Sequence, residues 1–291
     1  MAAITADAPA AGQADEFAFS DGHFDLLRRL VSKLAGIELG DSKRQLVYGR
    51  IARRIRTLEL PGFDAYCDLV TRADGVEIES FLNAITTNLT SFFREDHHFE
   101  FLARTALPQL QRANAASRRI RIWSAGCSTG EEPYSIAMTV RAALAPGPAW
   151  DVEILATDID SNVLATAAAG VYAPHRQQGI GPARLRRWFT TRDCPAGCVR
   201  VKDELRDMIR FAPLNLMEDW PFTEPFDAIF CRNVVIYFDR ATQAALFERF
   251  AGVMARHGHL FIGHSESLFG SCTRFELIGR TIYRPRSSMP A

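Results

Sequence analysis

The chain has 291 residues, of which 47% are hydrophobic and 23% are charged, and its formal net charge at pH 7 is zero. This length allows one large domain or two smaller ones, and the apolar fraction excludes a disordered chain. The chain contains no run of about 20 apolar residues, so no membrane-spanning helix is predicted. Its net charge of zero disfavours a general nucleic-acid binder, which would carry an excess of basic residues.

The first part of the chain is predicted to be a polar tail followed by a helical domain. Residues 1–19 contain few large apolar groups and are expected to be mobile. Residues 20–92 show apolar side chains at helical spacing, and Gly36 can end the first helix in a left-handed conformation. Helices are predicted from Ser20, from Asp41 or Ser42, over 63–72 and over 76–86.

The rest of the chain, residues 93–291, is predicted to form an α/β domain, because strands alternate with helices from about Arg118. Such alternation indicates a parallel sheet with helices on both faces. The predicted strands are 120–123, 152–156, 208–212, 228–231 and 259–262, the predicted helices are 131–145, 161–169 and 240–255, and a closing hairpin is predicted over 275–284.

One segment breaks this alternation. Residues 172–205 are predicted to be an inserted β-subdomain, with a short helix near 182–189 and a hairpin around Asp193–Cys198. Cys194 and Cys198 could form half of a metal site, but no second pair of ligands appears at suitable spacing, so we expect no metal. Six cysteines without a dense framework, and no recognisable signal peptide, favour a cytoplasmic protein.

Two motifs follow the first two predicted strands. The string WSAGCSTGEEP, residues 123–133, contains small residues that let the backbone approach a ligand closely, although a tight turn before a helix would look similar. Asp158 ends the second strand, where a carboxylate can bind both ribose hydroxyls, and Asp160 is a candidate helix cap. A nicotinamide enzyme is disfavoured, because the second glycine of its motif is missing.

Two further motifs carry polar residues in apolar surroundings. The first is NLTSFFRE, residues 88–95, where the two predicted domains join. A capped helix start would explain Thr90 or Ser91, but not the Asn, the paired Phe and the Arg together. FDAIFCRNVVIYF, residues 226–238, places Arg232 and Asn233 inside an apolar run, which is costly without a function or a partner. Gly263–Ser267 nearly matches a nucleophile elbow, but its last residue is not glycine, so a serine hydrolase is not expected.

Together, NLTSFFRE, WSAGCSTGEEPYSIAM, ATDID, FDAIFCRNVVIYFD and GHSES resemble the chemotaxis receptor methyltransferases, the CheR family, from about residue 20 to residue 285. The resemblance implies a Rossmann-like class I S-adenosylmethionine-dependent methyltransferase sheet, an inserted β-subdomain and an all-α N-terminal domain. It implies methylation of glutamate side chains on the cytoplasmic helices of chemoreceptors, with S-adenosylhomocysteine as product.

The resemblance also implies a site. Arg94 and Tyr237 are expected to flank the transferred methyl group, and Asp158 to hold the ribose. Either Glu131 or Glu132 is expected to contact the cofactor. The other expected cofactor contacts are Asn88, Thr90, Arg94, Asn215, Leu216, Arg232 and Asn233.

Residues of the second predicted helix suggest how the receptor is bound. Arg50, Arg53 and Arg54 are predicted to face away from its apolar stripe, where they would complement a glutamate-rich helix, although a solvated basic face would look the same. The loop 192–198 is shorter than loops that dock a receptor peptide, so we expect action without a peptide tether. A monomer is the expected state. The alternative function is a sensor or adaptor that binds S-adenosylmethionine without catalysis; Arg94 with Tyr237 favours the enzyme.

Overall fold

The computed structural model describes residues 16–72, 76–144 and 149–286. These residues divide into two compact units. The first unit contains the residues up to Lys33 and Leu39–Ile85, and the second contains Leu34–Glu38 and the residues from Thr86 onward. Of the expected tail over 1–19, residues 1–15 lie outside the described residues, whereas the ring of Phe19 packs on that of Phe63 with the centroids 4.4 Å apart.

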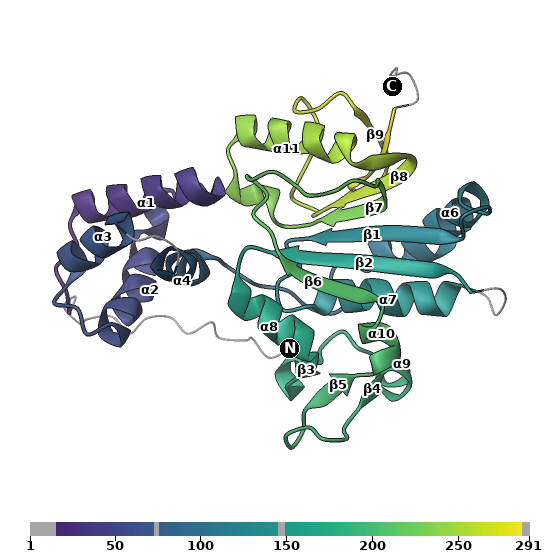
Figure 1. The fold of residues 1–291 in the computed structure, drawn as a ribbon, viewed down its shortest axis with the longest axis horizontal. Helices are drawn as coiled ribbons and strands as arrows, with labels where there is room; N and C mark the ends of the chain where they lie inside the picture. Colours follow the sequence, from purple (N-terminus) through teal and green to yellow (C-terminus); the bar gives the residue numbers. More distant parts are fainter. Residues whose placement is uncertain (1–15, 73–75, 145–148, 287–291) are drawn as a thin grey trace, which may run out of the picture. The chain divides into compact units, whose positions relative to one another are not determined.

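The first unit is helical, as predicted (Figure 1). Apolar residues at three- and four-residue spacing form its buried faces, Val47, Ile51 and Ile55 among them. Gly36 follows the first helix with a φ of 70°, which confirms the predicted left-handed end. The elements are α1 (Asp21–Ala35), the 3-10 turn η1 (Asp41–Lys43), α2 (Arg44–Thr57), α3 (Phe63–Arg72) and α4 (Val76–Ile85).

The second unit contains a mixed seven-stranded sheet in the order β6-β2-β1-β7-β8-β10-β9 (Figure 1). The strands from β6 to β8 pair in parallel, and β10 runs antiparallel to both of its neighbours. The strands are β1 (Arg119–Ala125), β2 (Asp151–Asp158), β6 (Ile209–Pro213), β7 (Phe226–Cys231), β8 (Met254–Ile262), β9 (Phe275–Gly279) and β10 (Ile282–Pro285). The predicted parallel sheet and closing hairpin are confirmed.

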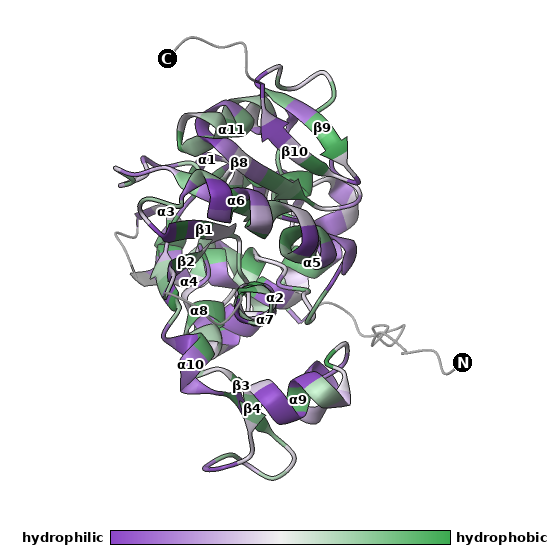
Figure 2. Cartoon of the chain, turned by 90° about the vertical axis from the view of Figure 1, so that its right-hand side faces the viewer, coloured by the Kyte–Doolittle hydropathy of each residue, from purple (hydrophilic) through white to green (hydrophobic). Residues whose placement is uncertain are grey.

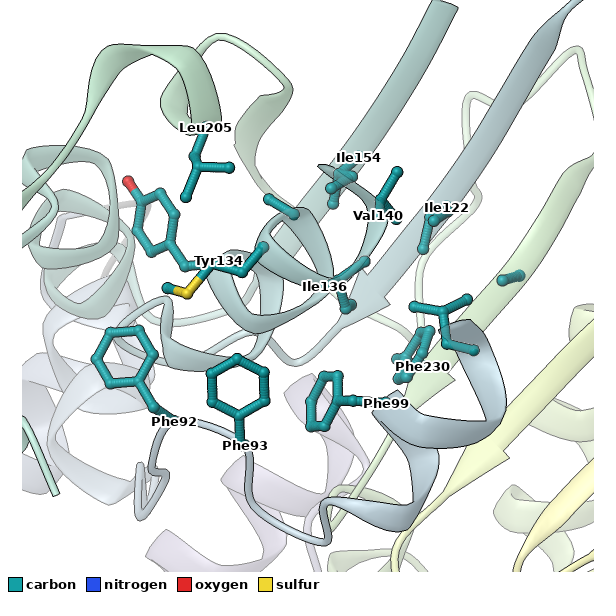
Figure 3. Close-up of a cluster of buried hydrophobic side chains, with 14 of the residues drawn as sticks. Phe92, Phe93, Phe99, Ile122, Tyr134, Ile136, Val140, Ile154, Leu205 and Phe230 are labelled. Atoms are coloured by element: carbon teal, nitrogen blue, oxygen red, sulfur yellow. The ribbon is translucent and has the colours of Figure 1, made fainter. Parts of the chain in front are cut away.

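Helices cover both faces of this sheet. One face packs Ile122 and Phe230 against α7 (Glu131–Ala143) and the segments before β1, and the other packs Trp123 and Ile229 against α11 (Arg240–Gly252). Successive strand residues point to opposite faces, so each strand feeds both cores. Figure 3 shows the first core, where Phe92, Phe93 and Phe99 lie in a row beside α7. The remaining elements of the main fold are α8 (Ser161–Ala169) and the 3-10 turn η4 (Val235–Tyr237).

The helical segment before β1 was not among the predicted elements. It consists of α5 (His97–Phe101), the π-helix η2 (Leu102–Ala106) and α6 (Leu107–Ala113); α5 and α6 are labelled in Figure 2. Both α5 and η2 contact α7. The strand β8 also begins five residues earlier than predicted, at Met254 instead of His259. The β7–β8 register shifts between Phe226 and Ala228, so the start of β8 is irregular and its sequence shows no alternation.

The predicted β-subdomain is present as a separate three-stranded sheet in the order β3-β5-β4. Tyr172, at the end of β3, donates a hydrogen bond of 2.8 Å to the carbonyl of Thr129, in the loop after β1. The inserted elements are β3 (Val171–Tyr172), the 3-10 turn η3 (Pro174–Arg176), α9 (Pro182–Trp188), β4 (Phe189–Thr190), β5 (Val199–Val201) and α10 (Asp203–Arg206). Among the described residues, no helix is long and apolar enough to cross a membrane.

We expect Phe230→Ala to lower the free energy of unfolding of the second unit by about 3–5 kcal/mol, the usual cost of emptying a buried aromatic site. The ring of Phe230 is fully buried and stacks on that of Phe261 with the centroids 4.1 Å apart. Urea unfolding would measure the change. The control Leu277→Ala, at an exposed position, should stay within about 0.5 kcal/mol of the wild type. Equal effects of the two substitutions would contradict this account of the core.

Candidate functional site

The candidate site lies at the carboxyl ends of the parallel strands, where the loops after β1, β2, β6 and β7 emerge. The loop after β1 is folded onto the end of β2. The amides of Gly126 and Cys127 both donate to the carbonyl of Thr157, at 2.8 and 2.9 Å. Gly126 has a φ of 81°, and a Cβ there would meet Val234 at 2.5 Å, so glycine is required.

Asp158 is fixed at the end of β2 by two backbone donors. The amide of Ser128 donates to one carboxylate oxygen at 2.8 Å, and the amide of Asp160 donates to the other at 3.0 Å. Burial raises the pKa of Asp158, whereas these two hydrogen bonds oppose the rise. Each oxygen has a second lone pair, so the fixed carboxylate can still accept hydrogen bonds from a ligand.

Asp160 joins α8 to the segment that carries NLTSFFRE. One of its oxygens accepts from the amide of Asn162 at 2.9 Å, which confirms the predicted helix cap. The other oxygen accepts from the side chains of Thr86 and Asn88, at 2.8 and 2.7 Å. Ser128 also donates to the carbonyl of Asn88 at 3.0 Å. Asn88 is therefore positioned between the loops after β1 and β2.

The two adjacent glutamates at the start of α7 are both buried and have different partners. Glu131 accepts from the hydroxyl of Thr129 at 2.6 Å and pairs with Arg176 of the insertion at 3.0 Å. Glu132 accepts from the hydroxyl of Ser124 at 2.7 Å and pairs with Arg232 at 3.0 Å. Burial raises the pKa of Glu132, and the charge of Arg232 opposes that rise.

Arg232 is the charged centre of the site, with a side chain only 2% exposed. One Nη atom lies 3.0 Å from Glu132, and the other lies 3.3 Å from Glu95 and donates to the carbonyl of Arg94. The partner that the sequence demanded for this arginine is thus supplied by two carboxylates. Because both of its Nη atoms contact groups of the protein, the Arg232 guanidinium stabilises the loops around the candidate site.

Glu95 was missed as a functional residue, although it is the last residue of the quoted motif NLTSFFRE. Its carboxylate pairs with Arg232 and accepts from His264 at 2.9 Å. Burial alone would raise the pKa of Glu95, but His264 and Arg232 outweigh it and lower the pKa to about 2. The Glu95 carboxylate therefore holds the loop that carries Arg94 against β7 and β8.

The GHSES string has a structural role at the same edge. Glu266 accepts from the amides of Gly263, Asn233 and Ile236 at 2.5, 3.0 and 3.3 Å. Asn233 has a φ of 59°, and a Cβ on Gly263 would collide with the Asn233 side chain. Glu266 thus holds the turn from Asn233 to Tyr237, which sequence reasoning did not predict.

The other expected site residues lie on the segment before α5 and on the loops after β6 and β7. Arg94 is half-buried, and its guanidinium donates to the carbonyl of Leu89 at 2.8 Å. Thr90, the residue after Leu89, is also half-buried. Tyr237 is half-buried at the end of η4, with its carbonyl accepting from the amide of Glu38 at 2.8 Å. After β6, Asn215 donates to the carbonyl of Leu34 at 2.7 Å, and Leu216 is buried.

The three arginines expected to bind substrate differ in their surroundings within the first unit. Arg50 donates to the carbonyl of Ile85 at 2.5 Å, and Arg54 forms a hydrogen-bonded ion pair with Glu77 at 2.5 Å. Arg53 is exposed, and its guanidinium has no ion pair within the described ranges. Two of the three therefore stabilise the helical unit, and Arg53 remains available to a partner.

The groups at this edge fit the polar parts of S-adenosylmethionine. Fixed carboxylates suit ribose hydroxyls and an amino group, and a guanidinium suits a carboxylate. Among the described residues, no three or more His, Cys, Asp or Glu side chains are grouped so that they could hold a metal ion.

Comparison with known proteins decides the family. A model described as the CheR methyltransferase SAM binding domain matches residues 88–284, and one described as the CheR methyltransferase all-alpha domain matches residues 22–86. The chain belongs to the CheR methyltransferase family. The predicted family, methyltransferase fold and S-adenosylmethionine cofactor are thereby confirmed.

Curated CheR relatives match over nearly their whole length. A probable chemotaxis protein methyltransferase of Rhizobium etli is 46% identical over 253 residues, covering 86% of this chain and 94% of the relative. The chemotaxis protein methyltransferase of Escherichia coli is 44% identical, with 92% of each chain covered. Chemotaxis protein methyltransferase 2 of Pseudomonas aeruginosa is 45% identical, covering 93% of this chain and 95% of the relative.

The Glu95→Gln variant should be less stable than the wild type at neutral pH and should lose this difference in acid. The pKa of Glu95 is about 2 in the folded chain, against about 4.3 for an unperturbed glutamate. The charged form therefore stabilises the fold above about pH 4.3, and the stabilisation disappears as the pH falls towards 2.

Urea unfolding of both proteins from about pH 6 down to about pH 2 would follow this difference as it shrinks below about pH 4.3. Glu204→Gln, at an exposed position on α10, is the control and should change stability little throughout. A difference for Glu95→Gln that stays constant with pH would contradict the assigned ion pairs.

Proposed function

We propose that this CheR methyltransferase transfers a methyl group from S-adenosylmethionine to glutamate side chains of chemoreceptors, giving glutamyl methyl esters and S-adenosylhomocysteine. The family match and the chemotaxis methyltransferase relatives support the reaction and its setting. The observation that carries the proposal is the hydrogen bond from Arg232 to the carbonyl of Arg94. This bond fixes the backbone of Arg94, whose guanidinium is less buried than that of Arg232 and would face the reacting groups.

The substrate side of the reaction requires orientation more than activation. A glutamate with a pKa of about 4.3 is already a carboxylate at neutral pH, so no general base is needed. S-adenosylmethionine supplies a methyl group on a positively charged sulfur, which is a good leaving group. Holding the two reactants in line can account for about 7–11 kcal/mol of the barrier.

Arg94 and Tyr237 are the residues assigned to this orientation. The Arg94 guanidinium has further N–H donors besides the one bound to Leu89, and these can hold the substrate carboxylate by charge-assisted hydrogen bonds. Tyr237 can donate a hydrogen bond to the substrate or position the methyl donor. The positive φ values of Phe93 and Glu95, 55° and 58°, fix the backbone on either side of Arg94.

The cofactor is assigned to residues on the strand-end loops. Asp158 would accept the ribose hydroxyls, and either Glu131 or Glu132 would meet the cofactor at the start of α7. Asn215 and Leu216 would contact the adenine side. Asn88, Thr90 and Asn233 would complete the pocket, and Arg232 would act by fixing Glu132 and the Arg94 loop.

Receptor binding is assigned to the exposed basic residues of α2. A receptor helix that carries several glutamates complements Arg53 in charge, and such complementarity mainly speeds and orients association. The protein would act from the cytoplasm, as a monomer and without a peptide tether.

Arg94→Ala should lower methyl transfer by roughly 100- to 1000-fold, the usual cost of losing one electrostatic contact to the transition state. The assay measures base-labile label on receptor-containing membranes after incubation with methyl-labelled S-adenosylmethionine. The binding of S-adenosylhomocysteine, followed by calorimetry, should weaken by less than this factor. Arg112→Ala, at an exposed position on α6, is the control.

Three outcomes of that assay would count against the proposal. Equal activity of Arg94→Ala and the wild type would remove Arg94 from the reaction. A wild type that binds S-adenosylhomocysteine but never labels a receptor would favour the non-catalytic sensor. A wild type that binds no S-adenosylhomocysteine would contradict the cofactor assignment itself.

Arg53→Glu should raise the KM for receptor several-fold at low salt, and the effect should shrink as salt screens the charges. The binding of S-adenosylhomocysteine and the thermal stability should be unchanged, because Arg53 is exposed. Arg112→Glu makes the same charge change in the second unit and should leave the KM unaltered. A salt-independent effect of Arg53→Glu would point to a structural role instead.

A further inference from the structure

A cavity in the methyltransferase unit, away from the candidate site, lies between three helical segments, α5 with η2, α7 and α9. Its volume is about 450 Å³. This volume falls within the range of small-molecule sites, about 300–1,000 Å³. Alanines on each wall, Ala103, Ala142 and Ala183, leave the space open. The wall that holds Ala103 is the π-helix η2, a widened turn of a kind often found at functional sites.

The inner surface of this cavity is aromatic and apolar. Phe93, Phe99 and Trp188 line it and are each less than a tenth exposed, and Met138 of α7 adds a thioether. Such a surface is suited to the flat face of an aromatic ligand. Figure 3 shows Phe93 and Phe99 next to one another beside α7.

The mouth of the cavity is positively charged overall. Three arginines line it, Arg184 and Arg187 on α9 and Arg104 on η2, against two acids, Asp96 and Glu100. Figure 2 shows α9 as a largely hydrophilic helix. In the part of the chain that the structure describes, none of these three guanidinium groups forms an ion pair or a side-chain hydrogen bond.

Two of these arginines lie against the aromatic rings and not against carboxylates. The guanidinium of Arg184 is 3.6 Å from the ring centroid of Phe93, and that of Arg187 is 4.3 Å from that of Trp188. Cations at the edge of an aromatic surface, with hydrogen-bond donors unused, are arranged to bind an anion that is attached to a flat apolar body.

The two phenylalanines that line the cavity also contact the candidate active site. Phe93 immediately precedes Arg94, and its amide donates to Ser135 of α7 at 3.0 Å. Phe99 lies under Arg232, whose guanidinium is 5.6 Å from its ring centroid. A ligand in the cavity would therefore touch the neighbours of both arginines of the site.

We propose that this cavity binds a small aromatic anion, a flat apolar body carrying a carboxylate, sulfonate or phosphate, and that its occupancy changes the affinity of the cofactor site through Phe93 and Phe99. The anionic group would lie at Arg184 and Arg187, and the flat body would lie between Phe93 and Trp188. Hydrogen-bond donors on the ligand would face Asp96 and Glu100.

The test uses 8-anilinonaphthalene-1-sulfonate as the probe, with the full chain saturated with S-adenosylhomocysteine. The Arg184→Gln, Arg187→Gln double variant should weaken probe binding by about tenfold, a fluorescence titration being the readout. Arg186→Gln is the matched control, because Arg186 is exposed on the same helix but does not line the cavity; it should stay within about twofold.

A second variant tests the cavity by its shape. Ala142→Trp, at an exposed position on the α7 wall, should block the probe, whereas Arg141→Trp on the same helix should not. Equal probe affinity in the double variant and Arg186→Gln, or equal binding to both tryptophan variants, would overturn the site. Complete displacement of the probe by S-adenosylhomocysteine would place the probe in the cofactor site and would also overturn it.

The charge requirement and the coupling have separate readouts. The uncharged analogue N-phenyl-1-naphthylamine should bind more weakly than the sulfonate, and equal binding would remove the anion from the proposal. Saturating probe should shift the Kd for S-adenosylhomocysteine by about fivefold, and an unchanged Kd would overturn the coupling. Neither readout uses methyl transfer, so failure here is distinguishable from failure of receptor methylation.

Discussion

Arg232 carries a charge into the interior of the methyltransferase unit, at the end of the fully buried strand β7. Such a charge is tolerated only with paired carboxylates and further hydrogen bonds, which Glu132, Glu95 and the carbonyl of Arg94 provide. Removing either carboxylate would leave the buried guanidinium with only one charged partner. This single guanidinium therefore fixes the start of α7, the loop before α5 and the end of β7 relative to one another.

The aromatic core holds the same loop from its other side. Phe92 packs edge-on against Tyr172 of the insertion, with the centroids 4.8 Å apart, and Phe93 packs edge-on against Phe99, with the centroids 5.3 Å apart. Two residues of this loop, Phe93 and Glu95, adopt positive φ values that are unfavourable for non-glycine residues. Burial of the rings and the ion pairs of Glu95 offset that cost, and Arg94 is thereby held between two constrained neighbours.

The insertion contributes contacts to the candidate site although it forms a separate sheet. Arg176 pairs with Glu131, and Tyr172 donates to the carbonyl of Thr129. Gly130, which lies between Thr129 and Glu131 in the sequence, has a φ of 95°. A Cβ at this position would lie 2.8 Å from the Tyr172 hydroxyl. The glycine thus permits the insertion to pack directly on the loop after β1. The same insertion supplies α9, one wall of the cavity proposed to bind an aromatic anion.

The sequence by itself determined the features that depend on neighbouring residues. Apolar spacing predicted the helices of the first unit and the strands β1, β2 and β7. Local residue preferences predicted the Asp160 cap and, through the left-handed conformation open to glycine, the end of α1 at Gly36. The motifs at the strand ends indicated where the site would lie, because parallel strands bring their carboxyl ends to one edge. These features are local, so periodicity and residue type were sufficient to predict them.

Only the tertiary structure decided which residues of the site act on one another. The ion-pair partners of Arg232 are Glu95 and Glu132, which lie far from it in the sequence. No local sequence pattern selects these two carboxylates over the others in the chain. The segment from α5 to α6 is stabilised by packing on the sheet and not by a clear repeat. Arg50 and Arg54 follow the same sequence pattern as Arg53, yet contacts with Ile85 and Glu77 engage the first two within the helical unit. These outcomes depend on long-range packing and charge compensation, which exist only once the chain has folded.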